Sequence, residues 1–286
     1  MICVQFRVLD AAPCTGDRTA MTEIIDCEYT VEGDGPPLFL IHGIGAARDT
    51  WRYMTPLLGR YFTVVSYDLR GHGASPMPNS EFGLDELVDD LERVRERTGI
   101  ERAHFAGHSL GGMIGPAYAR RYPKRVQSLG LLSTAAFRTE DDSAKAKGVV
   151  TAMEERGVPN VLETLTDRWY TDDFMEQNPE VVRRRLDQVI ACDPDIFLNV
   201  FQIYASVEMA PWIHEIEAPS LVLTGENDGG CNPRLNRQIG DALANAKLVI
   251  LPGLKHSILL EAGALVADHI ARFIQGLDEH PSNAIG

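Results

Sequence analysis

The stretch Gly107-His108-Ser109-Leu110-Gly111-Gly112 has the pattern G-x-S-x-G, with a serine at its centre. Residues 102–106 before it are typical of a short strand, and residues 110–122 have helical spacing that ends at Pro123. A serine in so tight a strand-to-helix turn stands exposed at the tip of a sheet, where the helix start points backbone N–H groups towards it. The stretch therefore predicts that Ser109 is a nucleophile, with an ordinary glycine-rich turn as the alternative.

Short apolar runs recur on both sides of this stretch, and helical patterns lie between most of them. Strands that alternate with helices predict a parallel sheet covered by helices on both faces. Functional side chains of such sheets gather at the carboxyl ends of the strands. The expected strands are 24–31, at an edge, and then 38–41, 63–67, 103–106, 126–132, 220–224 and 247–251, and the expected helices are 84–98, 110–122, 232–243 and 261–274.

Residues 137–212 interrupt the alternation, because they contain only helical patterns with charged faces. A block of this length between two strands is too long for a simple crossover. Since it leaves and returns at carboxyl ends of strands, we expect a helical cap, or lid, over Ser109. The core is then 22–136 together with 213–286, and residues 1–21 form a loosely ordered N-terminal extension before a second candidate start at Met21. The helices expected within the cap are 144–156, 161–170, 179–190 and 197–207.

A serine hydroxyl is a weak nucleophile until a base takes its proton and an acid orients that base. His256 follows the last expected strand in a loop that contains a glycine, which favours it as the base over a solvated surface histidine. The preceding strand ends near two carboxylates, Glu226 and Asp228. Asp228 has the shorter and stiffer side chain, so it is favoured as the acid, and Glu226 is the alternative. The order Ser109, Asp228, His256 is typical of one particular fold.

Acyl transfer also needs N–H donors for the negative charge that develops on the carbonyl oxygen. Leu110 lies at the helix start beside the serine, so its backbone N–H is one expected donor. The turn after the first buried strand, residues 41–45, has glycines on both sides of Ile44, whose N–H is the second expected donor. His42 in the same turn is expected to support the loop by hydrogen bonds.

Composition excludes several kinds of partner. The net charge of −14 argues against nucleic acid and anionic membrane surfaces, and no segment approaches the ~20 apolar residues of a membrane span. The cysteines are odd in number and lack C-x-x-C spacing, so neither a disulfide framework nor a metal site is indicated. They are Cys3, Cys14, Cys27, Cys192 and Cys231. Without a secretion signal, a cytoplasmic location is expected.

The motifs together resemble the α/β-hydrolase family over roughly residues 24–276. The resemblance rests on His42-Gly43, the stretch around Ser109, Asp228, His256 and the segment Asp68-Leu69-Arg70-Gly71-His72-Gly73-Ala74-Ser75. It implies the α/β-hydrolase fold, a mostly parallel sheet flanked by helices with an inserted helical cap. It also implies that the D-x-R-G-x-G-x-S segment is a structural turn, in which His72 is not a catalyst.

The segment Arg168-Trp169-Tyr170-Thr171, followed by Asp193-Pro194, is similar to the cap of 3-oxoadipate enol-lactonases. The similarity implies a serine hydrolase, without a cofactor, that cleaves a small carboxylic ester or lactone of aromatic catabolism through an acyl-enzyme. Trp169 and Tyr170 are expected to line the pocket, with packing inside the cap as the alternative. Arg168 is expected to meet a substrate carboxylate, ahead of Arg138 and the arginines at 183–185. The alternative functions are a carbon–carbon bond hydrolase of ring-cleavage products and a non-enzymatic ligand receptor.

Overall fold

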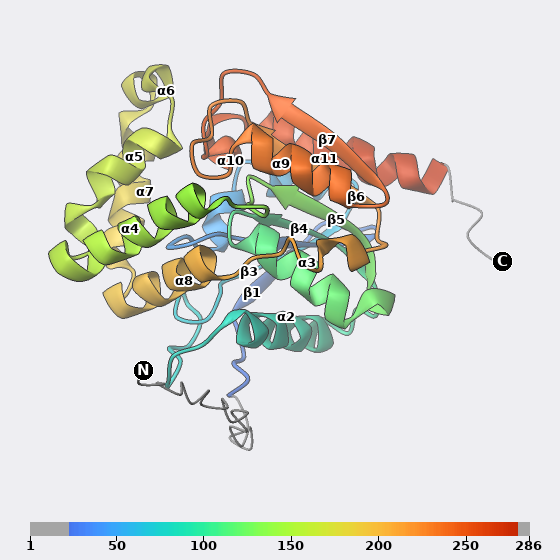
Figure 1. Cartoon of the computed structure of the whole chain (residues 1–286). Coiled ribbons are helices and arrows are strands. Elements are labelled where there is room, and N and C mark those ends of the chain that lie inside the picture. The colour runs from blue at the N-terminus through green and yellow to red at the C-terminus, as the bar shows by residue number, and fades with distance from the viewer. Residues whose placement is uncertain (1–22, 280–286) are drawn as a thin grey trace, which may run out of the picture.

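The computed structural model describes residues 23–279, and a seven-stranded sheet lies at the centre of this part of the chain (Figure 1). The strand order is β1-β3-β2-β4-β5-β6-β7; β1 pairs antiparallel with β3 and all other neighbours are parallel. The carboxyl ends of the parallel strands therefore share one edge. The expected extension at 1–21 lies outside the described residues. The strands are β1 (Tyr29–Glu32), β2 (Pro37–Ile41), β3 (Thr63–Tyr67), β4 (Ala103–His108), β5 (Val126–Leu132), β6 (Ser220–Gly225) and β7 (Ala246–Leu251).

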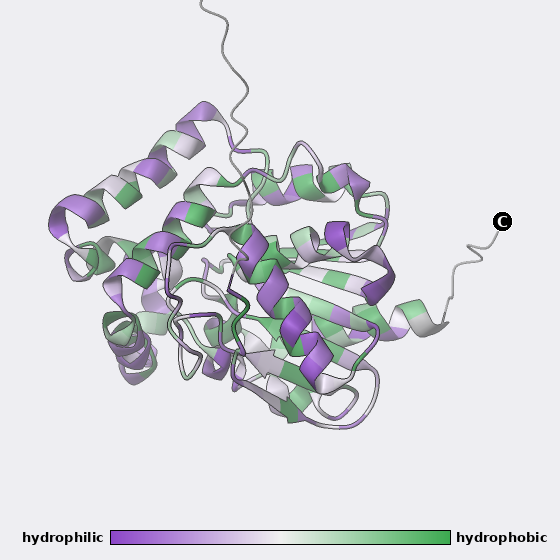
Figure 2. Ribbon diagram, turned by 90° about the horizontal axis from the view of Figure 1, so that it is seen from below, coloured by the Kyte–Doolittle hydropathy of each residue, from purple (hydrophilic) through white to green (hydrophobic). Residues whose placement is uncertain are grey.

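Helices cover both faces of the sheet because side chains alternate along the strands. On β2, Phe39 and Ile41 pack with α2 (Leu84–Thr98), α3 (Gly111–Arg121) and α9 (Pro233–Ala242). Leu38 and Leu40 point the other way and pack with α1 (Thr55–Leu58), α10 (Ile258–Glu261) and α11 (Gly263–Glu279). Figure 2 shows apolar and polar residues alternating along the helices around the apolar sheet. Short 3₁₀ helices lie at Arg48–Trp51, Pro123–Arg125, Val158–Asn160 and Ile213–Glu215.

A separate group of helices follows β5 and precedes β6, and we call helices α4–α8 the cap helices. In Figure 1 they lie together beside the sheet, with a small apolar core of their own that includes Met153, Leu165 and Phe197. They are α4 (Glu140–Arg156), α5 (Leu162–Trp169), α6 (Asp172–Gln177), α7 (Pro179–Ala191) and α8 (Pro194–Ser206). The sequence pattern missed α6, because six residues are too few to show a helical period.

The N-terminal edge differs from the expected strand 24–31, because β1 begins only at Tyr29. The preceding residues lie against α2 and include a tight turn, in which the N–H of Cys27 donates to the carbonyl oxygen of Ile25 at 3.0 Å. The N–H of Ile25 donates to Asp90 at 3.0 Å, and Arg97 donates to the carbonyl oxygen of Cys27 at 2.8 Å. The apolar pattern at 24–28 therefore reflects burial under a helix rather than pairing in the sheet. None of the described helices has the length and apolar character needed to cross a membrane.

The loop after β3 is held by its own acidic residue, as expected for a structural turn. The Asp68 carboxylate accepts the N–H groups of Arg48 (2.7 Å) and Ala74 (3.0 Å). Gly73 has a φ of 54°, and a Cβ there would lie 2.3 Å from an Asp68 oxygen, so only glycine fits. Arg70 forms a buried ion pair with Asp90 on α2 at 2.6 Å. These contacts hold the loop beside the carboxyl end of β2.

Candidate active site

Ser109 lies in a sharp turn between β4 and α3. Its φ of 57° is in the left-handed region, which costs a non-glycine residue about 1–3 kcal/mol. A Cβ on Gly107 would lie 2.0 Å from the carbonyl oxygen of Gly111, and one on Gly111 would lie 2.1 Å from that of Ile41. Both flanking positions therefore require glycine, and the backbone strain falls on the predicted nucleophile.

Two hydrogen bonds from the β5 side fix this strained turn. The N–H of Ser109 donates to the carbonyl oxygen of Leu132 at 2.9 Å, and the hydroxyl of Thr134 donates to the carbonyl oxygen of Ser109 at 2.9 Å. Leu110 follows as the N-cap residue of α3. Its N–H lies among those at a helix start that have no partner within the helix, in keeping with the expected donor role.

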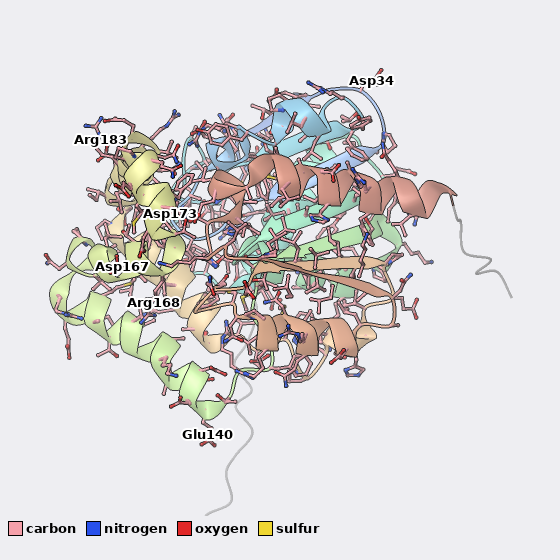
Figure 3. The ribbon with its side chains drawn as sticks, turned by 90° about the horizontal axis from the view of Figure 1, so that it is seen from above. Asp34, Glu140, Asp167, Arg168, Asp173 and Arg183 are labelled. Atoms are coloured by element: carbon pink, nitrogen blue, oxygen red, sulfur yellow. The ribbon has the colours of Figure 1, made fainter. Side chains whose placement is uncertain are left out.

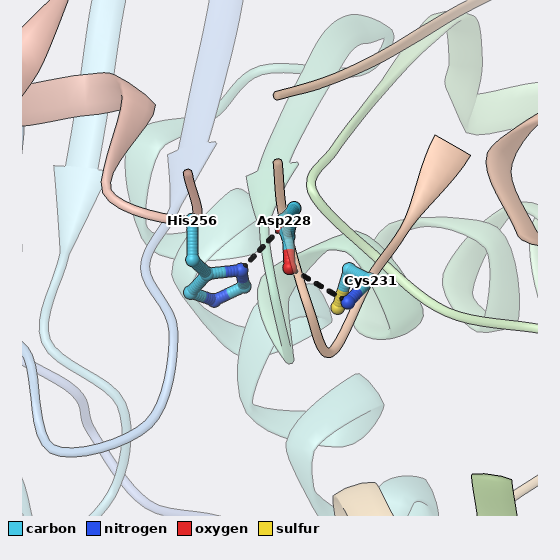
Figure 4. Close-up of side chains that lie close together, drawn as sticks. All are labelled: Asp228, Cys231 and His256. Atoms are coloured by element: carbon cyan, nitrogen blue, oxygen red, sulfur yellow. Dashed lines mark hydrogen bonds and ion pairs between the residues drawn. The ribbon is translucent and has the colours of Figure 1, made fainter. Parts of the chain in front are cut away.

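Asp228 and His256 meet at the ends of β6 and β7 (Figure 4). Nδ1 of His256 lies 2.7 Å from Oδ2 of Asp228, whose other oxygen accepts the N–H groups of Gly230 (3.0 Å) and Cys231 (2.8 Å). Glu226, the alternative acid, is exposed and accepts the N–H of Gly253 at 2.9 Å. The structure thus brings Asp228, and not Glu226, to the imidazole.

The turn after β2, which we call the β2 turn (residues 42–46), packs against Ser109. A Cβ on Gly43 would lie only 3.0 Å from Cβ of Ser109. Nδ1 of His42 donates to the carbonyl oxygen of Gly43 at 2.8 Å, and the N–H of Ala46 approaches the same oxygen at 3.3 Å. In a trans peptide the N–H points opposite to the carbonyl, so this anchoring sets the direction of the Ile44 N–H.

His42 and His72 stabilise the β2 turn as neutral side chains. Nδ1 of each ring donates to a carbonyl oxygen of its own loop. Nε2 of His42 accepts the N–H of Leu69 at 2.9 Å, and Nε2 of His72 accepts that of Gly45 at 3.2 Å. Burial is the main cause that lowers the pKa of both rings. Their hydrogen bonds leave Ile44, rather than Gly45, as the donor expected for an oxyanion.

Ser109, Asp228 and His256 line one cavity of about 350 Å³. Residues of the cap helices, among them Trp169 and Phe197, form much of its other wall. A volume of this size lies at the small end of the range for ligand pockets, about 300–1,000 Å³.

The family model described as "alpha/beta hydrolase fold" matches residues 36–263. This chain belongs to the α/β-hydrolase family. The expected family and fold class are confirmed, and the comparisons with individual proteins agree. An enol-lactonase from Burkholderia xenovorans LB400 has a TM-score of 0.81 at 25% identity, covering 88% of this chain and 97% of that structure. The 3-oxoadipate enol-lactonase 2 of Acinetobacter baylyi is 27% identical over 69% of this chain and 73% of its own length. Lipase 3 of Moraxella sp. is 26% identical over 85% and 78%.

In this hydrolase the Asp228–His256 pair has opposed pKa shifts. Burial disfavours the imidazolium, but the charge and hydrogen bond of Asp228 outweigh it and hold the pKa of His256 well above its usual value. Burial likewise raises the pKa of Asp228, but the His256 charge and the N–H donors outweigh it and keep that pKa below the usual value. Asp228 is therefore ionised at neutral pH and favours a proton on the imidazole.

We expect hydrolysis by this chain to rise with pH as His256 loses its proton. A general base must be neutral, so a raised pKa moves the acidic limb of kcat/KM to a pH above about 6.5, the value of an unperturbed histidine. The measurement is kcat/KM for a neutral ester between about pH 5 and 10. A midpoint at or below the ordinary histidine value would contradict the pairing, and NMR titration of His256 in Asp228→Asn should show a lower pKa.

His108, next to Ser109, was expected from the sequence to line the pocket or to support the site, and it lines the cavity. Its Nε2 donates to the carbonyl oxygen of His256 at 3.0 Å, and the two rings lie 4.9 Å apart. Burial, with a further contribution from the His256 charge, lowers the pKa of His108 to about 3. A neutral His108 thus connects the end of β4 to the loop that carries His256, a contact across 148 residues.

The cap residues selected from the sequence lie in different surroundings. Arg168 is exposed and Trp169 half-buried, and both line the cavity. Tyr170 is fully buried, stacks on Phe174 and is not among the described residues that line the cavity, which fits the alternative of packing inside the cap. Arg183 lies at the outer edge of the cap and pairs with Glu180 at 2.6 Å (Figure 3).

Asp228, His256 and Cys231 also form a cluster with the chemistry of a metal site. One ligand atom from each lies within 4.8 Å of the others. However, the Asp228 oxygens already accept hydrogen bonds from His256 and two backbone N–H groups, which a metal ion would have to displace. These contacts favour an interaction between Asp228 and His256 over metal binding. Cys231 is free and buried, as is Cys27, while Cys192 is free and half-buried.

Proposed function

We propose that the chain is a serine hydrolase that cleaves a small carboxylic ester or lactone through an acyl-enzyme. The observation that carries the proposal is the 2.7 Å contact between Nδ1 of His256 and the Asp228 carboxylate, in the same cavity as a serine held in a strained turn. Nucleophile, acid and base come from the loops that follow β4, β6 and β7, at one edge of the sheet. This arrangement and chain order match the Ser-Asp-His triad of the fold.

The proposed reaction begins when Oγ of Ser109 attacks the carbonyl carbon and its proton passes to Nε2 of His256. Asp228 holds the ring in the tautomer that leaves Nε2 free and stabilises the imidazolium. The N–H groups of Leu110 and Ile44 donate to the oxyanion. His256 then returns the proton to the leaving alkoxide. Water, deprotonated by the same ring, hydrolyses the acyl-enzyme and restores the serine.

The charges around the cavity favour an anionic substrate. Its lining includes four cationic side chains, Arg138, Lys145, Arg168 and Arg185, against two carboxylates, Asp142 and Asp228. Arg138 lies 3.9 Å from Glu208 and Lys145 lies 2.9 Å from Asp141, so the cations that matter most here are Arg168 and Arg185. In a chain with a net charge of −14, these local cations attract an anion against the overall field. The lactonase names of relatives and the apolar wall that includes Trp169 support a carboxylate-bearing lactone as the substrate class.

Labelling with a fluorophosphonate, which reacts with an activated serine, and a panel of substrates together test the proposal. We expect the fluorophosphonate to label the native protein at Ser109 and to leave Ser109→Ala unlabelled. The panel contains neutral short-chain esters, anionic lactones and a dienoate ring-cleavage product. Faster turnover of the dienoate than of any ester or lactone would favour a carbon–carbon bond hydrolase. An unlabelled native protein without turnover would support a ligand receptor.

Arg168→Gln should weaken binding of an anionic lactone while sparing a neutral ester. A charged hydrogen bond contributes about 1.5–3 kcal/mol, and because Arg168 is exposed we expect the lower end, a rise in KM of about tenfold. The neutral ester is the internal control, since it has no carboxylate to lose. Equal losses on both substrates would mean that Arg168 only stabilises the cap.

A further inference from the structure

Arg185 on α7 donates two hydrogen bonds to the backbone of the β2 turn. Its Nη2 donates to the carbonyl oxygen of Ile44 at 2.9 Å, and its Nη1 to that of Gly45 at 2.5 Å. These carbonyls directly follow the peptide that presents the Ile44 N–H. A cap helix therefore holds the turn that is expected to supply one oxyanion donor.

The surroundings of Arg185 differ from those of its neighbours on α7. Arg183 pairs with Glu180 and Arg184 with Asp49, but Arg185 has no ion-pair partner among the carboxylates whose side chains the structure describes. Its guanidinium lies over the ring of Trp169, 5.3 Å from the centroid. Burial lowers its pKa, and arginine nevertheless remains charged in proteins. The hydrogen-bond partners described for this half-buried charge are mainly backbone carbonyls.

The β2 turn is held from both the core and the cap. Gly45 has a φ of 58°, and a Cβ there would lie 2.4 Å from the ring of Phe197 on α8. The carbonyl of Gly43 is anchored by His42, and those of Ile44 and Gly45 by Arg185. Successive peptide planes are therefore oriented partly from the core and partly from the cap.

The charge of Arg185 also reaches the histidines around Ser109. Burial is the main cause that lowers the pKa of His42, His72 and His108, and the positive charge of Arg185 lowers each of them further. Arg185 also lines the cavity that contains Ser109, so its positive charge contributes to the field in that cavity.

The cap residue under Arg185 also contacts the loop of the catalytic base. The carbonyl oxygen of Trp169 accepts the N–H of Ser257 at 2.8 Å, and Nζ of Lys255 donates to the carbonyl oxygen of Asp167 at 2.9 Å. The residues on both sides of His256 are therefore attached to the end of α5. The same Trp169 supports Arg185 with its ring and the His256 loop with its backbone.

We propose that Arg185 is a positioning residue that holds the oxyanion donor from the cap, so that the oxyanion hole is complete only with the cap in place. The inference rests on the proposed ester or lactone hydrolysis. It differs from a role in binding the substrate carboxylate, because the two carbonyl contacts exist without any substrate. Loss of Arg185 should therefore slow the hydrolysis of neutral and anionic esters alike.

The test compares Arg185→Gln with Arg183→Gln, a matched control that removes the same charge from an exposed position of the same helix. With a neutral short-chain ester, we expect Arg185→Gln to lower kcat by about 10- to 100-fold, somewhat less than the roughly 10²–10³ for outright loss of an oxyanion donor. KM should stay within about twofold, because ground-state binding is unaffected. Arg183→Gln should match the native protein in both constants.

A neutral trifluoromethyl ketone, which forms an oxyanion on Ser109, supplies a second readout. We expect its inhibition constant to rise in Arg185→Gln by the same factor as kcat/KM falls, since both report the oxyanion hole. Arg185→Lys should recover part of the loss, and thermal unfolding shows whether each variant is folded.

The possible results distinguish the positioning role of Arg185 from the proposed ester or lactone hydrolysis. Unchanged kcat and unchanged ketone affinity in a folded Arg185→Gln would overturn the positioning role, while fluorophosphonate labelling of native Ser109 would leave the proposed hydrolysis intact. A loss confined to KM for anionic lactones would also overturn it, because Arg185 would then bind the carboxylate. A native protein that neither labels nor hydrolyses any ester or lactone overturns both proposals.

Discussion

Ser109→Ala is expected to reduce ester or lactone hydrolysis to the residual that binding and the oxyanion donors supply. Serine, base and acid act as a unit, so His256→Ala should be about as damaging and the double variant little worse. Across such triads the loss in kcat is on the order of 10⁶-fold. The measurement is kcat on the best substrate of the panel, with thermal unfolding to show that the fold is retained.

Within the same triad, Asp228→Asn should lower kcat by roughly 10⁴-fold without unfolding the chain, because an amide favours the wrong tautomer of His256. Glu226→Gln is the matched control, since this exposed carboxylate accepts a backbone N–H and makes no contact with the imidazole in the structure. If Glu226→Gln lost activity while Asp228→Asn retained it, the assignment of the acid would be wrong.

Gly107→Ala is expected to disrupt the turn that carries Ser109. The new Cβ would lie 2.0 Å from the carbonyl oxygen of Gly111. This oxygen belongs to the backbone at the start of α3, so it cannot move aside as the end of a flexible side chain could. We expect a loss of about 4 kcal/mol or more in the free energy of unfolding, the range of the most damaging core substitutions. Urea denaturation measures it, and fluorophosphonate labelling of Ser109 should disappear.

Gly115→Ala on the same helix is the control for this substitution. A Cβ at Gly115 meets only a side-chain carbon of Leu129, at an ordinary 3.7 Å. Alanine is favoured over glycine inside a helix by up to about 1 kcal/mol, so this variant should be as stable as the native protein or more stable. Similar stability losses in both variants would mean that the close approach at Gly107 relaxes easily.

The sequence by itself determined the elements of the core and the order of the site residues. Residues 63–67, 84–98 and 126–132 coincide with β3, α2 and β5, because apolar periodicity is a local property of a segment buried on one or two faces. The turn at Ser109 could also be predicted from the sequence, because glycines are needed next to the strained serine where neighbouring backbone segments approach closely. Patterns were weaker where an element is short, as in α6, or where an apolar segment packs under a helix, as at Ile25.

The contacts between distant segments were decided only by the tertiary structure. Glu226 and Asp228 stand two positions apart, and the backbone turn at Gly230 and Cys231 selects which of them reaches His256. Arg183 and Arg185 belong to the same run of three arginines, so the local sequence does not distinguish them. Arg183 pairs with Glu180 at the outer edge of the cap, whereas Arg185 donates to the carbonyl oxygen of Ile44, which lies 141 positions earlier in the chain. These contacts form between segments that are far apart in the sequence. The hydrophobic pattern within one segment does not indicate which distant residues it will contact after folding.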